Sequence, residues 1–146
     1  ERELIPMAQT YGYGIIPWSP LGGGLLTGKY RRGQEPPEGS RYSEAGRRES
    51  PRYTEHVYDA VEAIDSIVES KGCTVAQFAL SWVVNQPGVT SPIIGPRTME
   101  QLVDNLGAID VEVTDADRQA IDAVVPPGES RAPFYQADFG PHQYRV

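Results

Sequence analysis

The sequence contains one cysteine, Cys73, among its 146 residues. A single cysteine cannot form a disulfide within the chain, and it cannot supply a zinc site built from several thiolates. The two histidines, His56 and His142, lie far apart in the sequence, and neither has neighbours at the spacing of a metal site. We therefore expect no metal ion.

Long hydrophobic runs and an excess of positive charge are also missing. No apolar run approaches the roughly 20 residues that span a bilayer, and the N-terminus has no signal-peptide pattern. The 13 lysines and arginines stand against 20 aspartates and glutamates, which gives a net charge of -7. General electrostatic binding to nucleic acid or to anionic membranes is therefore not expected. A cytoplasmic location is the default expectation.

An initiator methionine is absent as well. The chain opens with ERELIPMAQTYG, in which Leu4, Ile5 and Ala8 have the spacing of one helix face. This pattern predicts a helix over about residues 2–11 whose earlier part is missing. We expect the chain to be a fragment of a longer protein.

Helical periodicity and capping motifs predict several further helices. Apolar residues recur on one stripe over residues 55–71. Two threonines are each followed, three residues later, by Gln, which predicts capping boxes and helix starts there; they are Thr74 with Gln77 and Thr98 with Gln101. Thr114 with Asp117 predicts the start of a last helix. The last two helices are expected to end near residues 107 and 124.

Two short apolar segments, residues 15–19 and 90–95, predict strands, and residues 20–51 predict one long loop rich in Gly, Pro, Arg and Ser. Strands that alternate with helices indicate an α/β fold with a parallel sheet. Two parallel strands alone make a poor sheet, because their faces and edges need cover. Missing residues or a second copy of the chain should supply the rest.

Two junctions have the composition of a ligand site. WSPLGGGLLTGK, residues 18–29, places three glycines just after a predicted strand, where backbone can approach a ligand closely. Its spacing fits neither a Walker A loop nor GxGxxG, and a flexible turn is the simpler alternative.

The second junction, Gly95-Pro96-Arg97-Thr98, lies where a strand ends and a helix begins, so free backbone N–H groups there favour an anion. Arg97 opposes the helix dipole at that position. An ordinary surface arginine is the alternative explanation.

These two junctions resemble the end of the aldo-keto reductase barrel, a TIM-type fold. GIIPWSPLGGGLLTGKY is similar to the seventh strand and its following loop, and VAQFALSWVVNQPGVTSPIIGPRTMEQLVDNLGAI to the helix, eighth strand and cofactor helix. The resemblance covers residues 1–125 and is nearest the branch of bacterial reductases and potassium-channel β subunits. It implies an α/β fold, a partial TIM (β/α)8 barrel that holds the last two strands with their helices. Residues 126–146 form a C-terminal tail, a candidate part of the substrate pocket.

The resemblance implies that the chain binds NADP(H), and it assigns roles to individual residues. Gly95 and Arg97 would hold the 2′-phosphate, Gln101 the adenosine ribose region, and Asp104 and Asn105 the adenine. The pyrophosphate path would be lined by Trp18, Ser19, Pro20, Leu21, Gly22 and Gly23. The long loop would fold over the cofactor at Lys29, Ser40 and Arg41. An arginine fork suits a phosphate, and such barrels gather their sites at the C-terminal ends of the strands.

The family's catalytic Asp, Tyr, Lys and His come from the first half of the barrel, and none of those motifs occurs in this chain. Tyr30, Tyr42 and Lys71 lie outside the matching segments. We therefore predict a C-terminal fragment of an NADP-dependent reductase of aldehydes and ketones, without its catalytic residues. The alternatives are an NADP-sensing regulatory or interaction protein of the channel β-subunit type, and a structural remnant without ligand. The isolated chain should self-associate or need its N-terminal half.

Overall fold

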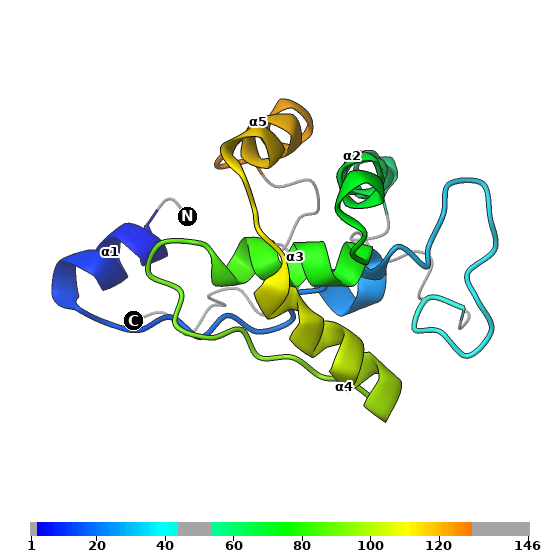
Figure 1. Ribbon diagram of the computed structural model, residues 1–146, viewed down its shortest axis with the longest axis horizontal. Coiled ribbons are helices and arrows are strands. Elements are labelled where there is room, and N and C mark those ends of the chain that lie inside the picture. The colour runs from blue at the N-terminus through cyan, green and yellow to red at the C-terminus, as the bar shows by residue number, and fades with distance from the viewer. Residues whose placement is uncertain (1–2, 44–53, 130–146) are drawn as a thin grey trace, which may run out of the picture.

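The computed structural model describes residues 3–43 and 54–129 of the chain, and its helices pack around a central one. The central helix is α3 (Val75–Val84). On one side of α3 lie α2 (Glu55–Lys71) and α5 (Asp115–Val124), and on the other lie two extended segments and α4 (Met99–Leu106) (Figure 1). Helix α1 (Leu4–Tyr11) precedes them at one end of the molecule. Two 3₁₀ turns, η1 (Gly22–Thr27) and η2 (Gly107–Asp110), complete the described elements.

One of the two predicted capping boxes is confirmed, and so is the predicted helix start at Thr114. At the start of α3 the Thr74 hydroxyl accepts from the Gln77 backbone N–H at 3.1 Å, and the Gln77 side chain accepts from the Thr74 N–H at 3.0 Å. Thr114 and Asp117 form the same pair at the start of α5. These contacts satisfy N–H groups that have no partner inside a helix.

The other predicted capping box, at the start of α4, forms only one of its two hydrogen bonds. Thr98 accepts from the Gln101 N–H at 3.3 Å, as predicted. The Gln101 side-chain oxygen, however, accepts from the Arg97 N–H at 2.8 Å instead of the Thr98 N–H. The amide therefore reaches one residue further back and fixes the backbone at Arg97.

The two predicted strands, residues 15–19 and 90–95, are not formed as regular strands in the described residues. Only two isolated parallel bridges connect these segments, Ile15 with Val89 and Trp18 with Ile93. The two bridges are three positions apart along the first segment and four positions apart along the second, so the second segment carries one extra residue. Pro17 and Pro92 donate no ladder hydrogen bond, and neither outer edge has a neighbouring strand in the described part. A parallel pair without neighbours therefore stays irregular.

The predicted long loop, residues 20–51, is more ordered in its described part than its composition indicated. It contains η1, and it contributes Leu25, Tyr30 and Tyr42 to a cluster with Tyr58 of α2. The tyrosine rings of residues 30 and 42 meet edge to face, with 5.2 Å between their centroids. A second cluster, Ile64, Val68, Val75 and Phe78, joins α2 to α3. The loop is thus anchored by aromatic burial, which a count of Gly and Pro does not reveal.

Candidate functional site

The larger cavity of interest has a volume of about 650 Å³ and lies where the two extended segments end. Its walls come from the turn after Trp18, from the start of α4 and from the start of α3. It is lined by Trp18, Ser19, Pro20, Leu21, Gly23, Gly24, Thr27, Lys29, Arg41, Thr74, Ala76, Ile93, Ile94, Gly95, Pro96, Arg97, Gln101, Asp104 and Asn105. Two sequence stretches some 75 residues apart therefore share one cavity, which the isolated bridge between Trp18 and Ile93 brings together.

The structure brings together all the predicted cofactor-contacting residues except Gly22 and Ser40. Gly22 lies in the same turn but lines a different cavity. Ser40 is buried, and its hydroxyl has no hydrogen-bond partner among the described residues. Neither residue lines the larger cavity.

The triple glycine has a conformational reason. Gly22, Gly23 and Gly24 all have positive φ, at 58°, 71° and 101°, a region that L side chains rarely adopt. A Cβ on Gly23 would lie 3.1 Å from Nη1 of Arg41, and one on Gly24 would lie 3.2 Å from Nζ of Lys29. The glycines thus admit two cationic side chains against the turn. The alternative of a merely flexible turn does not account for this packing.

Ser19 introduces the turn with strained backbone. It is the non-glycine residue with positive φ in the described part, at 55°, and its carbonyl accepts from the Gly22 N–H at 2.9 Å. A serine in this region costs free energy, and such residues concentrate at functional sites. The strain lies at the wall of the cavity.

Positive charge dominates the cavity wall. Lys29, Arg41 and Arg97 line it, and none of the three forms an ion pair within the described ranges 3–43 and 54–129. The one acidic lining residue, Asp104, accepts from the Thr74 hydroxyl at 3.2 Å. Three cations without a carboxylate partner suit a ligand with several negative charges.

The start of α4 stabilises negative charge independently of the arginines. The pKa of Glu100 lies below its usual range, first because its own backbone N–H donates to the carboxylate and second because of the Thr98 side chain. Free N–H groups at a helix start have this effect on any nearby anion. Arg97 and Gln101 stand beside this end of the helix and line the cavity.

Several lining residues were not predicted from the sequence. They include Gly24, Thr27, Thr74, Ala76 and the apolar pair Ile93 and Ile94. Gly24 had a visible signal, since it completes the glycine run. The sequence around Thr74 predicts only a helix cap, and nothing in it indicates that α3 begins beside α4.

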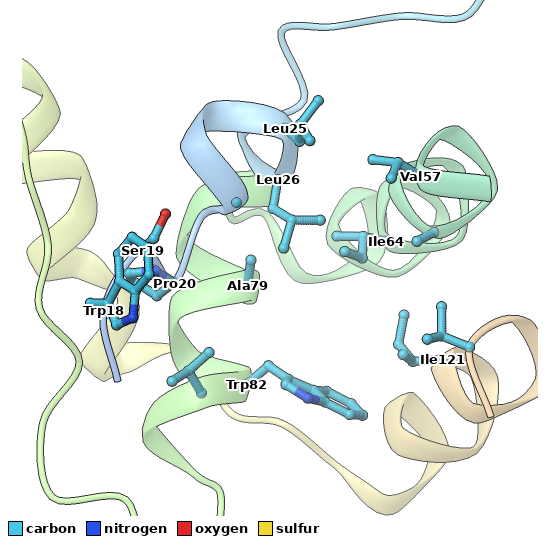
Figure 2. A pocket seen from close by; sticks show the side chains of 14 residues that line it. Trp18, Ser19, Pro20, Leu25, Leu26, Val57, Ile64, Ala79, Trp82 and Ile121 are labelled. Carbon is cyan, nitrogen blue, oxygen red and sulfur yellow. The ribbon is translucent and has the colours of Figure 1, made fainter. Parts of the chain in front are cut away.

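A second cavity, of about 360 Å³, lies between α2, α3, α5 and η1 (Figure 2). Trp82 extends from α3 towards Ile121, while Leu26 and Ile64 face the space from η1 and α2. None of its lining side chains is charged. Its chemistry is that of apolar packing and does not suit a nucleotide.

No helix in the described residues has both the length and the apolar character needed to span a membrane. The same residues hold no group of three or more His, Cys, Asp or Glu arranged to bind a metal ion.

Comparison with known proteins gives one consistent family. The profile of the Aldo/keto reductase family matches residues 1–126. A protein of Schizosaccharomyces pombe named putative voltage-gated potassium channel subunit beta is 42% identical over 115 residues, covering 75% of this chain and 33% of that protein. The probable voltage-gated potassium channel subunit beta of Oryza sativa is 34% identical over 143 residues, covering 93% of this chain and 42% of its own length. YrpG, an uncharacterized oxidoreductase of Bacillus subtilis, is 37% identical over 115 residues, covering 77% and 32%.

Among solved structures, a glycerol dehydrogenase from Gluconobacter oxydans superposes with a TM-score of 0.69. It is 24% identical in sequence, and the match covers 91% of this chain and 41% of that one. This likeness supports the TIM-barrel fold class. The chain spans about a third to two fifths of the length of the relatives it matches. By the match over residues 1–126, the chain belongs to the aldo/keto reductase family.

Proposed function

We propose that the chain is the C-terminal part of an NADP-dependent aldo-keto reductase and that the larger cavity binds the phosphate groups of NADP(H). The observation that carries this is the convergence of Lys29, Arg41 and Arg97, all without carboxylate partners in the described residues, on one cavity. Members of the family generally use nicotinamide dinucleotides, whose phosphates supply the matching negative charge. The residues present fit the cofactor.

The proposed contacts are those that the family resemblance implies, and most of the residues concerned line the cavity. Arg97 and Gly95 hold the 2′-phosphate, because a guanidinium fork can donate two parallel hydrogen bonds to it. Gln101 contacts the ribose region through its amide N–H groups, since its oxygen is occupied by the Arg97 N–H. The adenine lies by Asp104 and Asn105. The pyrophosphate lies along the turn, between Lys29, Arg41 and the residues Trp18, Ser19, Pro20, Leu21 and Gly23.

The chain's own residues bind and orient the cofactor, which when bound supplies a hydride to the carbonyl carbon of an aldehyde or ketone. Tyr30 and Tyr42 are buried in the cluster under the loop, and Lys71 pairs with Asp117 on the far side of α3. These residues are therefore not placed as a proton donor at the cavity. We assign the acid to the N-terminal part of a parent protein, in the cytoplasm, and a share of the substrate pocket to the tail after residue 125.

Replacing Arg97 tests the proposal in the parent protein. Arg97→Ala should weaken NADPH binding about 10- to 100-fold, the range expected for losing a hydrogen bond to a charged group. NADH affinity should hardly change, because NADH has no 2′-phosphate. Fluorescence titration with both dinucleotides measures this, with Arg118→Ala on α5 as the matched control. Unchanged NADPH affinity would remove the assignment, and an equal loss for both cofactors would make Arg97 a structural residue.

A second candidate function is a regulatory protein that senses NADP(H) without useful turnover. The observation in its favour is that two of the relatives are named potassium channel β subunits. Both candidates predict the same Arg97 result, so the deciding measurement is carbonyl reduction by the parent protein. A remnant without ligand would bind neither dinucleotide.

A further inference from the structure

The segment of residues 28–43 carries two of the three cations of the larger cavity. Lys29 lies near its beginning and Arg41 near its end. The residues that directly follow these cations, Tyr30 and Tyr42, are 1% and 4% exposed and pack together against Leu25 and Tyr58. The contact between these two rings holds the two ends of the segment together. The position of both cations therefore depends on how this segment is held against α2.

Two arginines tie the same segment to α2 from outside. Arg31 donates to both carboxylate oxygens of Asp65. Arg32 forms ion pairs with three further acids of α2: Glu55, Asp59 at 2.6 Å and Glu62 at 3.0 Å. Its guanidinium also stacks over the Tyr58 ring, 5.4 Å from the centroid. None of these arginines or acids lines the cavity.

The acids that receive the arginines form a single stripe on α2. Glu55, Asp59, Glu62 and Asp65 follow one another at spacings of four, three and three residues, which places them on one helix face. Like charges at such spacings repel one another unless cations lie between them. The Arg32 guanidinium also lowers the pKa of Asp59, chiefly through its hydrogen bond. The arginines of the segment and the acids of α2 therefore stabilise each other's charge.

These ion pairs are exposed enough to exchange with solvent. The side chains of Arg31 and Arg32 are 38% and 41% exposed. Single pairs of this exposure contribute little, but a cation shared among three carboxylates loses all its contacts at once when it leaves. These ion pairs are therefore in contact with solvent, whereas the Tyr30 and Tyr42 side chains are buried.

We propose that Arg31 and Arg32 are positioning residues, a clasp to the acidic stripe of α2 that keeps Lys29 and Arg41 at the cavity and sets the rate at which the dinucleotide leaves. This rests on the proposed function, because it assigns a release step to the same cavity. The arginines act through the position of the segment and do not touch the ligand.

Hydrogen–deuterium exchange tests the clasp without any cofactor. It is measured on the 146-residue chain and on the parent protein, for peptides within residues 30–43. Arg32→Ala should speed exchange there about 10-fold, the sum of three exposed pairs, and leave the α3 peptides unchanged. Arg118→Ala is the matched control, since it removes an arginine that stacks on Trp82 at 5.6 Å, outside the clasp. Unchanged exchange in Arg32→Ala would overturn the clasp.

The release step is tested by stopped-flow dissociation of NADPH from the parent protein. Arg32→Ala should release NADPH about 10-fold faster than the wild-type protein. The release rate of Arg32→Lys should lie between those of wild type and Arg32→Ala, because lysine keeps the charge but loses the planar fork of donors. Salt is not a substitute for these variants, since it also weakens phosphate binding directly.

A charge swap separates the pairing from the mere loss of an arginine. Arg31→Asp should speed both exchange and release, and adding Asp65→Arg should restore both. Faster exchange with unchanged release would overturn the role in dinucleotide release and leave the proposed function standing. A wild-type parent protein that binds neither NADPH nor NADH would instead overturn the proposed function, and the release step with it.

Discussion

The two sides of α3 differ in how completely the chain covers them. Towards α2 and α5, apolar side chains are buried: Phe78 is 1% exposed and Val61 2%. Towards the extended segments and α4, large apolar side chains lie open, with Trp18 54%, Met99 68% and Ile109 76% exposed. The larger cavity, lined by residues of the extended segments and of the start of α4, lies on this open side. The described residues complete one hydrophobic layer and leave a second one uncovered, next to the cavity that we assign to the cofactor.

The largest expected effect comes from breaking the covered side. Phe78→Ala should lower the free energy of unfolding by about 3–5 kcal/mol, because a fully buried ring is lost and leaves a cavity. Ile109→Ala, on the open side, should change it by no more than about 0.5 kcal/mol. Urea denaturation measures both, at concentrations low enough to keep the chain monomeric. Equal losses would mean that Ile109 is covered in solution and that the comparison is wrong.

The sequence predicted the covered side better than the open side. The stripe on residues 55–71, the capping box at Thr74 and the helix start at Thr114 rest on contacts within one helix, and the structure confirms them. Regular strands at 15–19 and 90–95 depend on neighbouring strands, which the described residues do not supply, so those predictions failed.

The candidate site shows the same difference between local contacts and contacts with distant parts of the chain. The resemblance identified residues on the two junctions, and most of them line one cavity. Ser40 does not line the cavity because its side chain is buried, and the local sequence does not reveal this burial. The approach of Thr74 to Asp104, at 3.2 Å, joins residues 30 positions apart and left no local signal.

A smaller effect is expected from the apolar stripe of α4 and η2. Met99, Val103, Leu106 and Ile109 recur at helical spacing and are all more than half exposed. Covering one such side chain is worth about 1.5–3 kcal/mol, so the isolated chain should self-associate through this stripe. Val103→Glu with Ile109→Lys should shift the chain towards monomer in sedimentation velocity, by about 10-fold or more in association constant.

The same double variant should behave in the opposite way in the parent protein. If other parts of the barrel cover the stripe there, two charges would be buried against apolar surface and the parent should lose stability. Arg118→Ala, which leaves the stripe intact, is the control in both proteins. A wild-type chain that sediments as a compact monomer at high concentration would contradict the idea that this face needs cover.

The smallest effect separates the two sides by their charges. On the covered side, Asp117 is 8% exposed, accepts from the Thr114 N–H at 2.7 Å and pairs with Lys71 at 2.9 Å. Burial alone would raise the pKa of Asp117, but the hydrogen bonds from Lys71 and Thr114 outweigh it and hold the pKa below its usual range. On the open side, the cations of the cavity have no carboxylate partner within the described part of the chain. Asp117→Asn should therefore cost roughly 1–3 kcal/mol at neutral pH, the value of hydrogen bonds to a charged group.

The pH dependence of that loss follows from the direction of the shift. Because the folded pKa is depressed, the stabilising contribution is fully present above the unfolded pKa of about 3.9 and is lost as pH falls through the lower, folded value. The difference in unfolding free energy between wild type and Asp117→Asn should thus be constant from about pH 7 to 5 and shrink below about pH 4. Asp122→Asn on the same helix, a partly exposed position, should stay within about 0.5 kcal/mol of wild type at neutral pH. A difference that persists undiminished in acid would mean that Asp117 stabilises α5 as a neutral cap, and that the charge pairing which distinguishes the covered side contributes nothing.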